Sequence, residues 1–149
     1  MFSKPDVILV DDHLIFRQGL KLFITVENIA TVVGEASNGL SFIELLSYLK
    51  PDLVLMDIDM PNMTGIEATQ KALELMPGLK IIAYTMFGSE ENYDKMTGLG
   101  AKGFILKSDG ISELEKAIQD VMRGDSYFSK ELPRNPFNNY DGNDANITA

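Results

Sequence analysis

Four short polar signals in this sequence each stand where an apolar run ends. Runs of this kind, about four to eight residues long, predict strands that are buried on both faces. The carboxyl ends of parallel strands share one edge of a sheet, and open α/β sheets bind their ligands at that edge. We therefore expect three acids, a hydroxyl and an ammonium to converge there: Asp11 and Asp12 after 7–10, Asp57 after 53–56, Thr85 after 81–84 and Lys107 after 104–106.

Three carboxylates in one place require a cation, because two unit charges about 4 Å apart repel by about 4 kcal/mol at an effective dielectric of about 20. Mg²⁺ suits such a site, since it takes oxygen ligands, keeps several waters and is usually held by one or two carboxylates plus a phosphate. A carboxylate can also accept a phosphoryl group as an acyl phosphate, which makes Asp57 the candidate nucleophile. Lys107 and Thr85 would then stabilise the phosphoryl oxygens.

The segments between these signals alternate strand-like and helix-like patterns. A further strand is centred on Val32 and Val33 and ends near Ala36. Periodicity predicts helices at about 13–27, 39–49, 64–76 and 89–98. The last helix has the clearest pattern, with Ser108 or Asp109 as its N-cap and apolar residues at steps of three and four: Ile111, Leu114, Ile118, Val121 and Met122. Five β-α units predict an α/β fold with a five-stranded, parallel, doubly wound sheet.

Composition removes several classes of function. The chain has no cysteine, which excludes disulfides, thiolate catalysis and cysteine-ligated zinc, and its single histidine excludes a histidine cluster. No apolar run approaches the roughly 18 residues of a membrane span, and the N-terminus does not read as a signal peptide, so we expect a cytoplasmic protein that does not contact a membrane. A net charge of −9 disfavours binding to DNA by this chain itself.

The composition changes at about Ser129. Residues 129–149 are rich in Asn and Pro and show no period, which is typical of a linker or tail. We therefore expect one domain over 1–128, followed by a linker or tail over 129–149.

The order of these motifs resembles the receiver domain of bacterial two-component response regulators, over about residues 5 to 128. Several details are similar to the NarL/FixJ-type subgroup, in which a helix-turn-helix DNA-binding domain usually follows the receiver. The resemblance depends on five segments: Asp11-Asp12-His13 with Arg17-Gln18-Gly19-Leu20, Val33-Gly34-Glu35-Ala36, Met56-Asp57-Ile58-Asp59-Met60-Pro61 with Gly65, Thr85-Met86, and the run from Gly100 to Lys107.

The resemblance implies a flavodoxin-like (βα)5 sheet of order 2-1-3-4-5 and a role for each matching residue. Asp57 would be the phosphoacceptor. Its Mg²⁺ would be held by Asp12 and Asp57 directly, by Asp11 through water, and by the backbone carbonyl of Asp59. Thr85 and Phe104 would be the switch pair and Lys107 the phosphoryl-binding lysine. Where the family commonly has Asp or Asn before the glycine, this chain has Thr64, which we expect to alter only a turn or helix cap.

The resemblance also implies partners. A sensor histidine kinase would donate the phosphoryl group, phosphorylation would favour a homodimer, and DNA would be bound only through a C-terminal domain that lies outside this sequence. One alternative is a stand-alone receiver that acts by protein contact. A remote alternative is a haloacid-dehalogenase-like phosphatase, since Asp57 and Asp59 form an Asp-x-Asp motif, but that motif should open such a domain and would leave Asp11 and Asp12 unexplained. We interpret His13 as a solvent-facing or capping residue.

Overall fold

The apolar runs form one parallel sheet, in a computed structural model that describes residues 4–86 and 88–128. Neighbouring strands follow the order β2-β1-β3-β4-β5-β6. Residues 7–10 and 53–56 are almost entirely inaccessible to solvent, as expected for strands covered on both faces. The strands are β1 (Asp6–Val10), β2 (Thr31–Ala36), β3 (Leu53–Met56), β4 (Lys80–Thr85), β5 (Gly103–Leu106) and β6 (Tyr127–Phe128).

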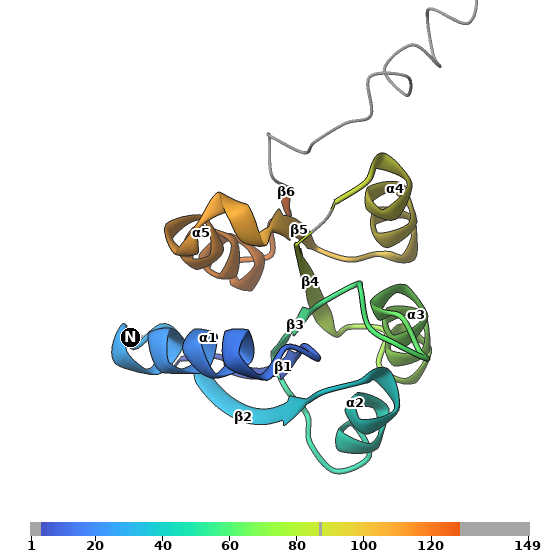
Figure 1. Cartoon of the computed structure of the whole chain (residues 1–149), viewed down its shortest axis with the longest axis horizontal. Helices are drawn as coiled ribbons and strands as arrows, with labels where there is room; N and C mark the ends of the chain where they lie inside the picture. The colour runs from blue at the N-terminus through green and yellow to red at the C-terminus, as the bar shows by residue number, and fades with distance from the viewer. Residues whose placement is uncertain (1–3, 87, 129–149) are drawn as a thin grey trace, which may run out of the picture.

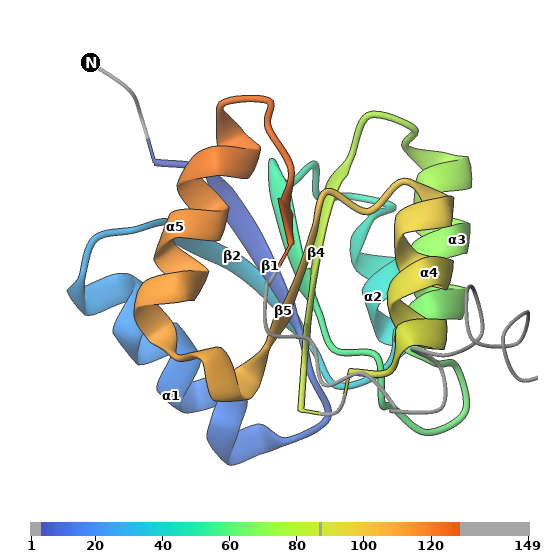
Figure 2. The ribbon, with the colours of Figure 1, turned by 90° about the horizontal axis from the view of Figure 1, so that it is seen from above.

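In the described part of the chain, five α-helices cover the two faces of this sheet. They are α1 (Leu14–Val26), α2 (Gly39–Leu45), α3 (Gly65–Leu75), α4 (Glu90–Leu99) and α5 (Ile111–Met122). Figure 1 shows α1 and α5 on one face and α2, α3 and α4 on the other. Alternate strand residues therefore enter different cores: Ile8 and Val10 pack with the α2–α4 layer, whereas Val7 and Leu9 pack with α1 and α5. The turned view in Figure 2 shows the same three layers.

The sheet has six strands among the described residues, so the predicted order 2-1-3-4-5 is correct for the first five strands and the predicted count of five is wrong. Gly103 and Phe104 of β5 pair in parallel with Tyr127 and Phe128 of β6. The ring of Phe128 packs edge-to-face on Tyr93, with 5.6 Å between ring centroids. Two residues are too few to show a strand period, which is why the sequence pattern did not predict β6.

Two helix ends also differ from expectation. α2 ends at Leu45 instead of about residue 49, and i→i−3 hydrogen bonds from Ser47 and Tyr48 begin the turn there. The N-cap of α5 is Gly110, because a 3₁₀ turn (η1, Lys107–Asp109) comes before the helix. Asp109 instead accepts a hydrogen bond from the backbone N–H of Leu106 at 3.0 Å. No helix in the described part of the chain is long and apolar enough to cross a membrane.

Candidate phosphorylation site

Strand register brings the predicted polar residues to one edge of the sheet. Val10 is level with Met56, and Met56 with Ala83, so β1, β3 and β4 end close together. Backbone hydrogen bonds continue the ladder past the strands, since the N–H of Asp57 donates to Val10 at 2.9 Å and that of Asp11 to Ala36 at 3.0 Å. The first residue after β1 and the first after β3 are therefore held rigidly side by side.

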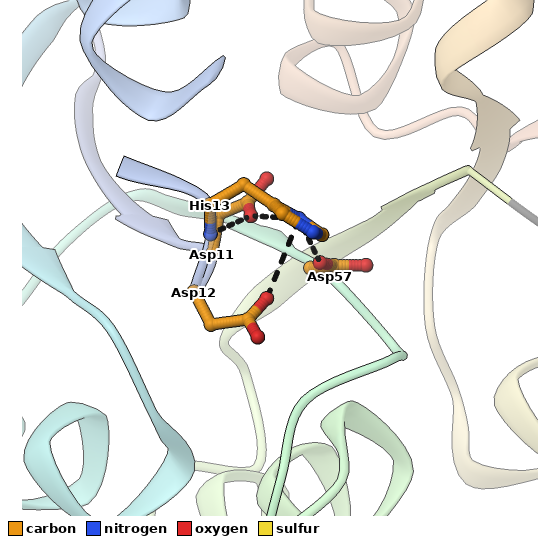
Figure 3. Close-up of side chains that lie close together, drawn as sticks. All are labelled: Asp11, Asp12, His13 and Asp57. Carbon is orange, nitrogen blue, oxygen red and sulfur yellow. Dashed lines mark hydrogen bonds and ion pairs between the residues drawn. The ribbon is translucent and has the colours of Figure 1, made fainter. Parts of the chain in front are cut away.

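Asp11, Asp12 and Asp57 form an acidic cluster that also includes His13, as Figure 3 shows. One potential ligand atom from each of the four lies within 4.8 Å of all the others. Asp11 and Asp57 are buried, with exposed fractions of 4% and 2%, whereas the side chain of Asp12 is 27% exposed. The sequence predicted the three acids but not the histidine.

Asp57 is the most buried acid of this cluster. Its pKa is raised from 3.8 to about 6, chiefly by burial and also by the charges of Asp11 and Asp12, while the Lys107 ammonium acts in the opposite direction. The backbone N–H of Asp59 donates to Oδ1 at 3.3 Å and also favours the ionised form. Oδ2 accepts no hydrogen bond from any described residue. This oxygen is therefore buried, poorly solvated and free to form a new bond.

Lys107 is the only ammonium that the described structure places against these acids. Its Nζ donates to Asp11 Oδ2 at 2.7 Å and lies 3.5 Å from Asp57 Oδ2, while its side chain is 3% exposed. The same ammonium stands 4.1 Å from the centroid of the Phe16 ring, and that ring packs on Tyr84 at 5.7 Å between centroids. Phe16 was not singled out from the sequence, because nothing in a helical pattern shows which residue lies under a distant lysine.

Arg17 holds the segment that carries Asp11. Its guanidinium donates to the backbone carbonyl of Asp11 and, at 3.0 Å, to Glu35 Oε1 at the end of β2. The motif containing Arg17 contributed to the family resemblance, but the sequence alone did not assign it this task. We interpret Arg17 as a clamp between the β1–α1 junction and β2.

Thr85 ends β4 and Phe104 lies on β5, and both are fully buried. The Thr85 hydroxyl donates to Asp59 Oδ2 at 3.3 Å, so in this conformation it is bonded to the acid two residues after Asp57. Phe104 lies on the α2–α4 side of the sheet and packs edge-to-face on Tyr93 of α4, with centroids 5.5 Å apart. Thr85 and Phe104 lie on neighbouring strands, since Ala83 pairs with Phe104 and Thr85 pairs with Leu106.

The loop after β3 is closed tightly on α3, and this closure requires glycine. A Cβ on Gly65 would lie 2.0 Å from the carbonyl oxygen of Asp57, a distance at which no side chain fits. The N–H of Gly65 donates to the carbonyl of Ile58 at 2.9 Å. Thr64 caps α3 in a capping box with Glu67, so its departure from the family pattern affects a helix cap, as expected.

This arrangement agrees with comparison to known proteins. The family model described as response regulator receiver domain matches residues 7–119. The chain belongs to this family. Receiver relatives include the nitrate/nitrite response regulator protein NarL of Escherichia coli strain K12, which is 37% identical over 126 residues covering 85% of this chain and 58% of NarL. The oxygen regulatory protein NreC of Staphylococcus carnosus is 34% identical over 95% of this chain and 67% of its own length.

Solved receiver structures have the same fold. A LuxR-family two-component response regulator from Aurantimonas sp. SI85-9A1 superposes with a TM-score of 0.83 at 32% identity, covering 87% of this chain and 93% of that chain. The isolated receiver domain of RcsB from Salmonella enterica serovar Typhimurium, solved with the phosphomimetic BeF₃⁻, gives a TM-score of 0.78 at 25% identity over 85% and 94% of the two chains.

The chain is thus a receiver domain of the NarL/FixJ type, and the phosphatase alternative is set aside. It spans 58% of the transcriptional regulatory protein DegU of Brevibacillus brevis, and similar shares of NarL and NreC. The predicted linker at 129–149 lies outside the described residues.

Proposed function

We propose that this receiver accepts a phosphoryl group on Asp57 from a sensor histidine kinase. The observation that carries this proposal is Asp57 Oδ2, a buried carboxylate oxygen that accepts no hydrogen bond from the described residues and lies 3.5 Å from the Lys107 ammonium. In the reaction Asp57 Oδ2 forms a bond to phosphorus while the bond from phosphorus to the kinase's histidine nitrogen breaks. The electron pair of that bond leaves on the imidazole, and Asp57 becomes an acyl phosphate.

The residues around Asp57 position the group and neutralise its charge. Lys107 is already within reach of both Asp11 and Asp57, so its ammonium can turn to a phosphoryl oxygen without unfolding anything. Thr85 can exchange its bond to Asp59 for one to another phosphoryl oxygen. Positioning and charge stabilisation of this kind account for most of the catalysis in phosphoryl transfer.

The donor set fits Mg²⁺. Asp11, Asp12 and Asp57 offer carboxylate oxygens within one small space, and Asp12 Oδ1 and Asp57 Oδ2 are buried without a hydrogen-bond partner among the described residues. We assign Asp12 and Asp57 as direct ligands, Asp11 as a ligand through water and the Asp59 carbonyl as the remaining protein ligand. When bound, the ion supplies positive charge that offsets the carboxylates and the phosphoryl oxygens.

Phosphorylation is then read out through packing. If Thr85 moves toward the phosphoryl group, it vacates space that the ring of Phe104 can enter, and the contact of Phe104 with Tyr93 transmits the change to α4. The surface of α4, β5 and α5 would therefore differ between the two states and favour a homodimer in one of them. One relative is the transcriptional regulatory protein DegU, and this protein would likewise regulate transcription. It would do so in the cytoplasm, through a DNA-binding domain joined by the 129–149 linker.

Intact mass spectrometry with acetyl phosphate and Mg²⁺ tests the acceptor. Wild type should gain one phosphoryl group and Asp57→Asn none. Asp94→Asn, which removes an exposed carboxylate from α4, should label like wild type and serves as the matched control. Equal labelling of wild type and Asp57→Asn would refute the assignment, and release of phosphate over many turnovers from small phosphate esters would revive the phosphatase reading.

A further inference from the structure

His13 turns its ring into the acidic cluster, where the sequence predicted only a solvent-facing or capping residue. It is the N-cap residue of α1, yet its side chain makes no cap hydrogen bond in the described structure. Its backbone N–H donates to Asp11 Oδ1 at 2.8 Å, which fixes the residue over the site. Figure 3 shows the imidazole facing all three carboxylates, while 61% of the side chain remains open to solvent.

We propose that Nδ1 of His13 is a nitrogen ligand of the proposed metal site, so that the cluster binds Mn²⁺, Co²⁺, Ni²⁺ or Zn²⁺ with an imidazole in the coordination shell. The inference rests on the proposed function only for the place of the metal. It changes the expected chemistry of the site from all-oxygen to mixed nitrogen and oxygen. Imidazole nitrogen is a good ligand for divalent first-row transition metals, whereas Mg²⁺ prefers oxygen ligands.

The distances fit one ion. Nδ1 lies 3.3 Å from Asp11 Oδ1, 3.5 Å from Asp12 Oδ1 and 4.0 Å from Asp57 Oδ2. Octahedral ligand bonds of about 2.1 Å place neighbouring ligand atoms about 3.0 Å apart and opposite ones about 4.2 Å apart. The 3.3 Å separation is close to the spacing of neighbouring ligands and the 4.0 Å separation is close to that of opposite ligands, while Asp12 Oδ1 has to approach Nδ1 by about 0.5 Å to become a neighbour. Small side-chain movements would therefore let Nδ1 share an ion with the carboxylates.

A second, independent observation points to a ligand in this space. Asp57 is 98% buried, and its Oδ2 accepts no hydrogen bond from the described residues; the same is true of Asp12 Oδ1. These two oxygens are the ones nearest Nδ1 on their respective side chains. Buried polar atoms normally have partners, and an ion between them would satisfy both oxygens and the ring nitrogen together.

Ligation by His13 predicts a difference between metals. Loss of the imidazole should weaken Ni²⁺ binding by roughly tenfold or more, since loss even of a group that only supports a ligand costs 10–100-fold in affinity. Mg²⁺ binding should change by less than about threefold, because this ion gains little from nitrogen. Loss of the Asp12 carboxylate should weaken the binding of Ni²⁺ and of Mg²⁺ by similar factors.

The chain contains a single histidine, so a metal–imidazole signal can come only from His13 when the protein carries no affinity tag. Pulsed EPR of the Mn²⁺-loaded, untagged protein should show coupling to an imidazole ¹⁴N, and this coupling should vanish in His13→Gln. Calorimetric titration with NiCl₂ and with MgCl₂ should show the selective loss in His13→Gln and the common loss in Asp12→Ala.

Two results would overturn the proposal. One is absence of ¹⁴N coupling in the Mn²⁺-loaded wild type, or equal Ni²⁺ affinity in wild type and His13→Gln. The other is tighter binding of both metals by His13→Gln, which would show that the ring acts as a competing cation. Neither measurement uses a phosphoryl donor. Labelling of Asp57 without nitrogen coupling would therefore refute this inference alone, and nitrogen coupling without labelling would refute only the proposed function.

Discussion

Asp57 should destabilise the folded receiver at neutral pH when no metal is present, and Asp57→Asn should remove that effect. Burial is the largest cause of its raised pKa. Between pH 4 and 6 the carboxyl of the unfolded chain ionises before that of the folded protein. In this interval the folded state keeps a proton that the unfolded chain has lost. The contribution of Asp57 to the free energy of unfolding therefore falls as the pH rises through the interval. Above about pH 6 both states are ionised and the loss is complete.

The size of the effect follows from the pKa. A rise from 3.8 to about 6 corresponds to about 3 kcal/mol, because each pKa unit is worth about 1.4 kcal/mol. The charges of Asp11 and Asp12 contribute to the raised pKa of Asp57, so this figure belongs to the cluster and is an upper value for the single substitution. For a domain of this size it amounts to roughly 10 °C in melting temperature.

Urea unfolding or thermal melts in EDTA, at intervals from pH 4 to pH 8, would measure the difference between wild type and Asp57→Asn. The two should nearly coincide at pH 4, where the carboxyl is neutral like the amide, and diverge until about pH 7 with the variant more stable. Asp94→Asn, at an exposed carboxylate, should show no such divergence. A difference that stays constant over this range would refute the argument that ionisation of a buried carboxyl is its cause.

Adding Mg²⁺ at ten times its Kd should then stabilise wild type by about 1.4 kcal/mol, because the ion binds the folded state alone. The difference in stability between wild type and Asp57→Asn should become smaller.

Three further substitutions test separate parts of the site. Asp12→Ala should weaken Mg²⁺ binding and slow labelling by acetyl phosphate, while slightly raising the melting temperature without metal by relieving carboxylate repulsion; an unchanged Mg²⁺ titration would contradict this. Thr85→Ala should still be labelled at Asp57 but lose most of the change that BeF₃⁻ causes in sedimentation and in amide shifts around Phe104; a full response would show that the signal bypasses Thr85. Phe16→Leu should slow labelling roughly tenfold by removing the ring face under the lysine ammonium, with recovery in Phe16→Tyr; equal rates in wild type and Phe16→Leu would exclude that role.

The acids and the lysine could be predicted because their positions follow from strands. A buried parallel strand is recognisable from its apolar run, and its carboxyl end has a known place in an α/β sheet. That rule was enough to predict Asp11, Asp57 and Lys107. The structure places Lys107 Nζ 2.7 Å from Asp11 Oδ2 and 3.5 Å from Asp57 Oδ2. The family comparison adds the same fold independently.

The features that were missed depend on directions that a sequence pattern does not contain. His13 and Phe16 face the site because of how α1 begins after Asp11, and a helical period cannot tell which face of a helix lies over a distant strand. The bond from Thr85 to Asp59 depends on the closed loop after β3. β6 is recognisable only by its partner, since two residues carry no alternation of their own.

The charge balance of the site explains why metal binding and phosphorylation should be linked. Lys107 contacts Asp11 and Asp57 but not Asp12, so one ammonium faces a cluster of three carboxylates in the described structure and leaves an excess of negative charge. Phosphorylation replaces the single charge of Asp57 with nearly two on the phosphoryl group, which increases that excess. A divalent cation should therefore bind the phosphorylated state more tightly than the free state. By linkage, the factor by which phosphorylation tightens metal binding is the factor by which the metal favours phosphorylation. Asp57 Oδ2, which accepts no hydrogen bond from the described residues, is available to both partners in this coupling. A permanent hydrogen bond to this oxygen would stabilise the unphosphorylated protein and would weaken both metal binding and phosphorylation.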